Sequence, residues 1–381
     1  MNIAGQKSGL SWLVQISTAI LVVAWMIPTV GLFVSSFRTA DQISLTGWWK
    51  SLFPFEQNLT LRSAAPDTQV EVDGLYVIEG NLLTDSNASE IGAWGISSRA
   101  IDAFVPGDVA EMRDGGTIVV QENGDYRMEN TAPFEGSRGQ RVFVVAEVPP
   151  EFTLNNYQDM LFNSDRVDGM GKAFINTLTV AIPATIIPVL VAAFAAYALA
   201  WMNFPGRALL VAAVVGLLVV PLQLALIPLL KLHLGIGIGK GYLGTWLAHT
   251  GFGMPLAIYL LRNYMVGLPR DIIENARVDG ATEYQIFTRI ILPLSFPALA
   301  SFSIFQFLWV WNDLLVAKVF LIDATGETTI MTARIVEFMG SYGGNWEILS
   351  TAAFISIFVP LIVFFSMQKY LVRGLLSGSV K

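Results

Sequence analysis

The chain has 381 residues, of which 54% are hydrophobic and only 14% are charged, and its formal net charge at pH 7 is −7. Soluble domains carry about 25% charged residues, so this composition excludes an ordinary soluble protein. Cysteine is absent, which excludes disulfides and thiolate metal sites, and two histidines, His233 and His249, cannot form a metal site by themselves. The composition indicates a membrane protein, and we expect no metal site in it.

Six apolar runs are long enough to cross a bilayer as helices, which takes about 20 residues each. They lie at roughly 12–36, 173–200, 208–230, 243–262, 296–317 and 350–371. The first run is longer than the apolar part of a signal peptide, so we interpret it as a retained span. The runs predict an all-α polytopic membrane protein with six transmembrane helices.

A long polar segment separates the first two apolar runs. Between residues 37 and 171 there are 9 Lys and Arg against 21 Asp and Glu, a net charge of −12, whereas the rest of the chain has +5. Residues 68–80 and 116–129 alternate apolar and polar side chains, and a third strand is expected at 140–148. Asn123-Gly124 is typical of a hairpin turn. The segment therefore predicts an acidic, β-rich insert.

The basic residues of the short loops predict the orientation of the chain, because Lys and Arg prefer the cytoplasmic side. If the N-terminus is cytoplasmic, the basic residues on the cytoplasmic side are Lys7, Arg207, Arg262, Arg270, Arg277, Arg289, Lys369, Arg373 and Lys381. The opposite short loops would hold only Lys231, Lys240, Lys318 and Arg334, with Lys172 at a boundary. This bias predicts that both termini are cytoplasmic and that the insert lies outside.

One short charged segment lies between the fourth and fifth apolar runs. A partly amphipathic helix is expected after Pro269, and Gly280 is expected to end it. Thr282 and Gln285 then have the spacing of a capping box, which predicts a second helix running towards Pro293. A solvated loop without a partner is the alternative that these residues alone leave open.

The same segment resembles the signature of binding-protein-dependent ABC importer permeases. Its matching residues are Glu274, Ala276, Gly280 and Ile290-Ile291-Leu292-Pro293, while Asn275 stands where that family usually has Ala. Asp279-Gly280-Ala281 is similar to the form found in maltose-type sugar permeases. Further similar segments are Pro150–Leu161, Ile175–Ala181, Trp311–Leu315, Tyr342–Ala353 and Gln368–Lys381. The large acidic insert is similar to that of proteobacterial α-glucoside permeases.

This resemblance implies a type I ABC importer permease fold in the bacterial inner membrane. It divides the chain into the N-terminus and first transmembrane helix (1–40), a periplasmic β-rich insert with its return segment (41–165), and a permease core with five transmembrane helices (166–381). The core would include a cytoplasmic coupling loop (263–293) and a C-terminal tail (372–381).

The resemblance also implies a transport subunit that is not an enzyme. Its expected partners are a second permease subunit in a heterodimer, a cytoplasmic ATPase dimer, a periplasmic sugar-binding protein, an α-glucoside or other disaccharide, and membrane lipid, with no nucleic acid. ATP and Mg would be bound by the ATPase, so no cofactor is expected on this chain. The residues expected to couple to the ATPase are Glu274, Asn275, Ala276, Asp279, Gly280, Ala281 and Arg373.

Polar side chains within the apolar runs are candidates for a sugar path, because such groups face the interior of a helix bundle. The candidates are Asn176, Thr177, Gln223, Gln306, Asn312 and Asp313. Trp309 and Trp311 are expected to offer aromatic faces to a sugar ring. The alternative for each polar residue is a hydrogen bond between helices, which uses the same residue types.

Two other functional classes compete with an ABC permease. An ion-coupled secondary transporter would need intramembrane acidic or histidine relays, for which Asp313 is the one weak candidate. A membrane-anchored enzyme would need a catalytic group in the insert, which contains no histidine. Gly235–Gly241 is not a phosphate-binding loop, because its spacing fails and Gly241 follows Lys240 where Ser or Thr is required.

Overall fold

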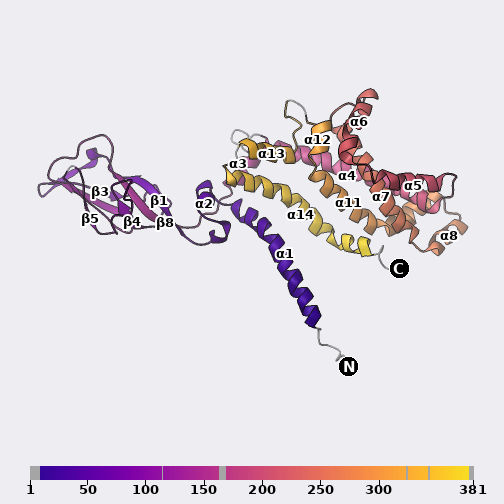
Figure 1. Ribbon diagram of the computed structural model, residues 1–381, viewed down its shortest axis with the longest axis horizontal. Helices are drawn as coiled ribbons and strands as arrows, with labels where there is room; N and C mark the ends of the chain where they lie inside the picture. Colours follow the sequence, from indigo (N-terminus) through magenta and orange to yellow (C-terminus); the bar gives the residue numbers. More distant parts are fainter. Residues whose placement is uncertain (1–8, 114, 163–168, 323–324, 342–343, 377–381) are drawn as a thin grey trace. The chain divides into compact units, whose positions relative to one another are not determined.

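The computed structural model describes residues 9–113, 115–162, 169–322, 325–341 and 344–376, with 341 and 371–376 described by their backbone alone. The chain divides into two compact units, Met1–Leu154 and Asn155–Lys381. The first unit contains a long helix and a β-domain, and the second is built from helices (Figure 1). Residues 155–162, predicted as part of the return segment, fall in the second unit.

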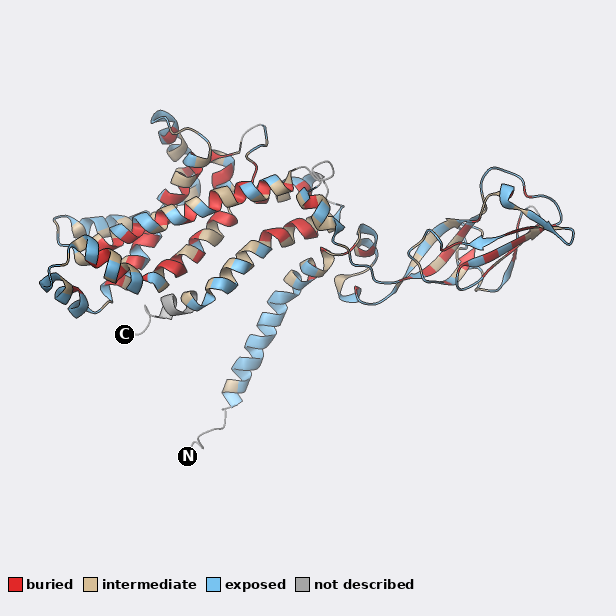
Figure 2. Ribbon diagram, turned by 180° about the vertical axis from the view of Figure 1, so that it is seen from behind, coloured by how far each residue is buried: buried red, intermediate tan, exposed pale blue. Residues whose placement is uncertain are grey.

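The first unit begins with helix α1 (Gly9–Ser35), which is 27 residues long and therefore about 40 Å in length. Gly31 is its buried residue, and Figure 2 shows the helix exposed along nearly its whole length. A helix that exposes apolar side chains on every face fits a hydrocarbon environment. The short helix α2 (Ala40–Leu45) and the 3-10 turn η1 (Trp48–Lys50) lead from α1 into the β-domain.

The β-domain consists of two antiparallel sheets, one of three strands in the order β1-β8-β4 and one of five in the order β2-β3-β7-β6-β5. The strands are β1 (Phe55–Arg62), β2 (Val70–Val72), β3 (Leu75–Asn81), β4 (Glu90–Gly95), β5 (Val109–Glu111), β6 (Thr117–Val120), β7 (Asp125–Asn130) and β8 (Arg141–Val148). Phe55 pairs with Val148, so the chain enters and leaves the domain on neighbouring strands. This β-rich region confirms the predicted insert.

Alternating side chains build the core of the β-domain. In β8 the buried residues Val142, Val144 and Ala146 alternate with more exposed ones. They share one apolar cluster with Trp94 and Ile118, which are fully buried. This period of two is the one expected for strands with one face on a core.

Two tight hairpins shape the five-stranded sheet. Gly124, with a φ of +87°, lies in the predicted turn between β6 and β7. A second turn at Asp73 and Gly74, with φ values of +50° and +82°, separates β2 from β3. The alternating residues 68–80 predict one strand but form two, because Asp-Gly favours a two-residue hairpin turn in which both residues have positive φ.

The second unit is helical, and small residues bring its helices close together. Its elements are α3 (Asn155–Phe162), α4 (Met170–Trp201), α5 (Arg207–Leu217), α6 (Leu222–Gly235), α7 (Tyr242–Val266), α8 (Arg270–Val278), α9 (Glu283–Ile286), η3 (Phe287–Ile291), α10 (Leu292–Leu294), α11 (Phe296–Trp311), α12 (Leu315–Phe320), α13 (Met331–Ser341) and α14 (Trp346–Leu376). Ala192 and Ala196 of α4 are fully buried in one cluster with Ala257 and Leu261 of α7. Such residues allow close approach of backbones, as in packed membrane helices.

Among the described residues, α1, α4 and α14 are each long and apolar enough to cross a bilayer. Two bent helix pairs, α5 with α6 and Glu283–Leu294 with α11, would raise the number from 3 to 5. The run at 208–230 is predicted as one span, but it forms two helices bent by 112°. Pro221 stands at the break, and a proline disfavours helical backbone in the residue before it. The count of six spans therefore stays a prediction.

Candidate functional site

The charged motif of the sequence lies on two short helices between α7 and α11. Helix α8 begins after Pro269 and has Asp271 in its first turn and Arg277 in its last, which suits the helix dipole at both ends. The chain then turns at Gly280, where φ is +78°. Glycine adopts this left-handed conformation without the steric cost that other residues incur. The predicted end of the first helix is confirmed.

A capping box starts the second helix, as predicted. The Thr282 backbone N–H donates to the Gln285 side chain (2.8 Å), and the Gln285 N–H donates to the Thr282 hydroxyl (3.3 Å). Helix α9 continues through η3, a wide π-type turn, into α10. The sequence gives no expectation of the wide turn, which precedes Pro293. Because proline cannot donate a helical hydrogen bond, a local change of helix type accommodates it.

Polar contacts fasten the inner side of this loop to α4. The Tyr197 hydroxyl donates to the carboxylate of Glu283, and Arg277 pairs with the same carboxylate at 3.0 Å. Arg277 also donates to the carbonyl of Trp201 at 3.3 Å, and the Trp201 indole donates to the carbonyl of Met265 at 3.1 Å. The hydrogen bond to Glu283 raises the pKa of Arg277. These contacts join α8, α9, α4 and the end of α7.

Apolar contacts strengthen the same attachment. Ile273, Ile286 and Ile291 are 0–1% exposed and belong to one cluster with residues of α4 and α7. The Phe287 ring lies 4.6 Å from the ring of Phe194 and 5.2 Å from that of Tyr197, centre to centre. Burial on this scale holds the loop to the ends of the long helices. The loop is thus attached to α4 by both polar and apolar contacts.

The outer side of the loop carries the residues expected to meet the ATPase. Glu274, Asn275, Asp279 and Gly280 are exposed, and Ala276 and Ala281 are half-buried. The structure thus gathers these six on one loop, and their coupling role stays a prediction.

The two most exposed apolar side chains on this loop are absent from the predicted set. Val278 is 86% exposed and Tyr284 is 69% exposed. Val278 is five residues after buried Ile273, which at 3.6 residues per turn places it roughly 140° around the helix. The five-residue spacing from Ile273 to Val278 can be read from the sequence, and it would have indicated that the two side chains lie on different faces of the helix. Exposed apolar groups among charged ones are typical of a protein-binding surface.

One further residue expected to couple, Arg373, lies on α14, but its side chain is outside the described residues. The same holds for the last part of the predicted tail, residues 377–381.

Asn176 and Thr177 of α4 are buried against the segment before α13. The Asn176 amide donates to the carbonyls of Glu327 and Thr329, each at 2.9 Å, and accepts from the Tyr242 hydroxyl at 2.8 Å. The Thr177 hydroxyl accepts from the backbone N–H of Met331 at 2.9 Å. These bonds join helices, as in the alternative considered for such residues.

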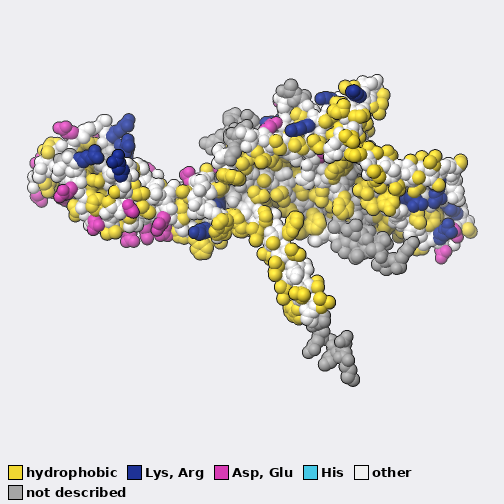
Figure 3. All heavy atoms as spheres, in the orientation of Figure 1, with side chains coloured by type: hydrophobic (Ala, Val, Ile, Leu, Met, Phe, Trp, Pro, Cys, Tyr) yellow, Lys and Arg dark blue, Asp and Glu magenta, His cyan; other side chains and the backbone are white. Residues whose placement is uncertain are grey.

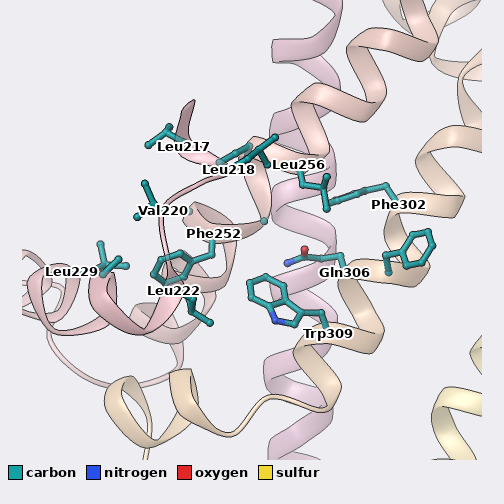
Figure 4. A pocket seen from close by; sticks show the side chains of 15 residues that line it. Leu217, Leu218, Val220, Leu222, Leu229, Phe252, Leu256, Phe302, Gln306 and Trp309 are labelled. Atoms are coloured by element: carbon teal, nitrogen blue, oxygen red, sulfur yellow. The ribbon is translucent and has the colours of Figure 1, made fainter. Parts of the chain in front are cut away.

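Gln306 lies at a cavity of about 650 Å³ formed by α5, α6, α7 and α11. Figure 4 shows Gln306 and Trp309 of α11 across from residues of the α5–α6 bend, among them Leu218 and Leu222. The Gln306 amide donates to the carbonyl of Ala184 at 3.1 Å and is 3% exposed. The cavity is therefore mostly apolar with one amide and one indole, a composition common in ligand pockets.

The remaining candidates lie apart from that amide. Gln223 is exposed near the start of α6, and Asn312 is exposed at the end of α11. Asp313 is buried, its carboxylate accepts from the N–H groups of Val316 and Ala317 at 3.0 and 3.2 Å, and it stands 3.8 Å from His249. This carboxylate caps α12.

Trp311 does not offer an aromatic face to a sugar, so that expectation is wrong. It is fully buried, and its indole donates to the carbonyl of Ser356 at 2.8 Å. Its neighbour by two residues, Trp309, is only half-buried and lines the cavity.

Residues 162–377 match the family of binding-protein-dependent transport system inner membrane components. The chain is 57% identical to the alpha-glucoside transport system permease protein AglG of Rhizobium meliloti (strain 1021), over 99% of this chain and 98% of that protein. It is 57% identical to the osmoprotective compounds uptake permease protein GgtD of Synechocystis sp., over 61% of this chain and 76% of that protein.

A solved bacterial ABC transporter that imports the acidic polysaccharide alginate is a more distant match. Its chain has 22% identity and a TM-score of 0.48, and the match covers 58% of this chain and 81% of that chain. The family match covers more than half of the chain, and the match to AglG extends through the β-domain as well. The chain belongs to the binding-protein-dependent transport system inner membrane components, the permeases of ABC importers.

Proposed function

We propose that this chain is the permease subunit of an ATP-driven importer of α-glucosides and forms half of its pore. The observation that carries the proposal is the loop of α8 and α9, which is fastened to α4 on one side and exposed on the other. The substrate class rests on the 57% identity to a permease named for alpha-glucoside transport, over 99% of this chain.

The proposed placement has six spans, both termini in the cytoplasm and the β-domain in the periplasm. It is supported by the basic residues of the short loops, such as Arg262, Arg270 and Arg289, which would all lie on the cytoplasmic side. The same placement puts the exposed loop of α8 and α9 in the cytoplasm, where an ATPase can reach it. In this arrangement α5 and α6 count as one broken span.

The proposed coupling uses the exposed loop as a lever. Glu274, Asn275, Asp279 and Val278 would contact a cytoplasmic ATPase dimer, which binds ATP and Mg, and Arg373 would contact it from the tail. Because the loop is joined to α4, a displacement of the ATPase would tilt that helix. This chain would then need no nucleotide or other cofactor of its own.

The proposed sugar path runs along the cavity at Gln306 and Trp309. An amide beside an indole can bind a hydroxyl and cover a sugar ring. A second permease subunit, different from this one, would close the open side of the cavity and supply further contacts. Asn176 and Asp313 do not line this cavity, so they would instead support the path through their hydrogen bonds within the fold.

An ion-coupled secondary transporter is the second candidate, and the buried pair of His249 and Asp313 is the observation that would favour it. The carboxylate of Asp313 already accepts two backbone N–H bonds at the start of α12. That use as a helix cap argues against a proton or cation relay there.

Reconstitution tests the proposal directly. When the permease is assembled in vesicles with its partner permease, ATPase and binding protein, uptake of an α-glucoside should require ATP and the loaded binding protein. Uptake should persist when ionophores collapse the proton and sodium gradients. Uptake by this chain without an ATPase, driven by an ion gradient, would establish the secondary transporter instead.

A substitution at Gly280 tests the coupling loop. Valine there would adopt positive φ at a cost of about 1–3 kcal/mol or shift the turn, so Gly280→Val should insert normally but lose more than nine-tenths of uptake. A steric clash within this chain would not cause the loss, because a Cβ at Gly280 has no atom within 4 Å. Binding of the ATPase and uptake are the two measurements.

Gly280→Asn is the matched control, because asparagine tolerates the left-handed region better than valine does. It should retain most of the uptake. Wild-type uptake and ATPase binding in Gly280→Val would refute the coupling argument, and equal loss in both variants would refute the role of the turn conformation.

The β-domain is proposed to contact the binding protein or the partner permease. Residues 37–171 have a net charge of −12, and on the face of the domain that Figure 3 shows, acidic side chains are spread widely while Lys and Arg lie close together. Arg113, Arg138 and Arg141 line a polar hollow of about 640 Å³ in this domain. Such an uneven distribution steers a partner of complementary charge, and the effect weakens with salt.

Excision of the domain tests this contact. Phe55 and Val148 are cross-strand partners, so residues 56–147 can be replaced by a short polar linker without separating the flanking segments. The expected result is a higher half-saturation concentration of loaded binding protein or a loss of the partner subunit. Normal assembly and uptake at low and high salt would mean that the domain is dispensable for transport.

A further inference from the structure

The segment between α1 and the β-domain exposes large apolar side chains. Trp49 is 68% exposed, Leu52 is 73% exposed and Phe53 is 65% exposed. The returning chain adds Phe152 and Leu154, at 49% and 67%. We call these five residues, with Leu45 and Lys50, the neck. Isolated exposed apolar residues are ordinary, but a group of this size marks a contact surface.

Hydrogen bonds hold the neck in a defined shape. The buried guanidinium of Arg38 donates to the carbonyls of Gln42 (2.7 Å) and Thr46 (3.0 Å) and to the Thr46 hydroxyl. The Thr153 N–H donates to the carbonyl of Phe37 at 2.7 Å, which ties the returning chain to the end of α1. With its amide oriented so that the nitrogen faces the Glu151 carbonyl, the Gln42 side chain pairs with both backbone groups of Glu151 at 2.8 Å. The apolar side chains are therefore presented outward by a fixed backbone.

The neck is also packed directly onto α1. The Trp48 indole lies so close to Gly31 that a Cβ there would be 2.8 Å from its nitrogen. Gly31 is the one buried residue among the described residues of α1, so this is where η1 covers the helix. The neck therefore follows α1 directly in the chain and packs on it at Gly31, and both expose apolar side chains.

The chemistry of the neck fits the polar–apolar boundary of a bilayer. Tryptophan next to lysine is typical of that boundary, because the indole has both an apolar ring and a polar N–H and the ammonium reaches the headgroups. Residues 42–55 contain Lys50 and no Asp or Glu, although the insert as a whole is strongly acidic. Lys50 beside these rings can reach the phosphate of a lipid headgroup, and the exposed carboxylate of Glu151 lies next to Phe152 on the returning chain.

We propose that the neck is a lipid-binding anchor that rests in the headgroup region of the bilayer and holds the base of the β-domain at the membrane surface. The proposal rests on the membrane placement of α1 given above. It assigns Leu45, Trp49, Lys50, Leu52, Phe53, Phe152 and Leu154 to contact with lipid. The opposite arrangement, in which a partner subunit covers the neck, is an outcome of the test below.

Single labelled sites test the anchor, and the absence of cysteine makes them clean. An environment-sensitive fluorophore is placed at Phe53→Cys in the full importer, reconstituted in vesicles of neutral and anionic phospholipid. Val109→Cys, in β5 and 60% exposed, is the matched control. Spin-labelled lipid and aqueous iodide serve as quenchers. We expect spin-labelled lipid to quench the Phe53 probe at least threefold more than the Val109 probe, and iodide to do the reverse.

A third site separates failure of the anchor from failure of the proposed function. Leu21→Cys in α1 is 61% exposed in the single chain and should be protected from iodide in the membrane. If iodide reaches it, the proposed placement of α1 is wrong. If Leu21 is protected but iodide quenches the Phe53 probe as strongly as the Val109 probe, the neck is in water and the anchor is refuted. Protection of the Phe53 probe from both quenchers would also refute it, because protein would then cover the neck.

Discussion

The proposed coupling of this chain to an ATPase depends on the attachment of the α8–α9 loop to α4. A loop that projects from a membrane protein can transmit force only if it is rigid within itself and fixed to a helix that crosses the bilayer. The Gly280 turn and the capping box at Thr282 provide the first condition, and the contacts of Tyr197 with Glu283 and Phe287 provide the second.

The free-energy contributions of the contacts show which of them attach the loop most strongly. The pair of Arg277 and Glu283 is half exposed, and such pairs contribute about 0–1 kcal/mol. Burial of one large aliphatic or aromatic side chain contributes about 1.5–3 kcal/mol, and Ile286, Phe287 and Ile291 are all buried here. The apolar residues therefore anchor the loop, while the ion pair and the Tyr197 hydroxyl fix its orientation.

Local features of this architecture follow from the sequence, because neighbouring residues determine them. The turn at Gly280, the capping box and the Asn123-Gly124 hairpin are of this kind. The break at Pro221 and the turn at Asp73-Gly74 also depend on neighbouring residues. They were not predicted, because the apolar run 208–230 predicts one span and the alternating residues 68–80 predict one strand. In contrast, the expectation that this loop couples to an ATPase rests on family resemblance, because charge and turn chemistry alone did not predict it.

Features that depend on distant partners could not be predicted in this way. Tyr197 and Glu283 are 86 positions apart, so their contact depends on how α4 packs beside the loop. Trp311 and Trp309 have the same chemistry, yet one is buried against α14 and the other lines a cavity. The helical period predicts which side chains share one face of a helix. Which neighbouring helix packs on that face depends on how the whole bundle assembles.

A distance measurement between the loop and α4 tests the central claim most directly. Spin labels at Val278→Cys and Leu190→Cys, both exposed positions, report that distance in the reconstituted importer. The account predicts one narrow distance distribution that is the same without nucleotide and with ATP bound, because the loop and α4 move together. A distribution that broadens, or a mean that shifts between the two states, would contradict it.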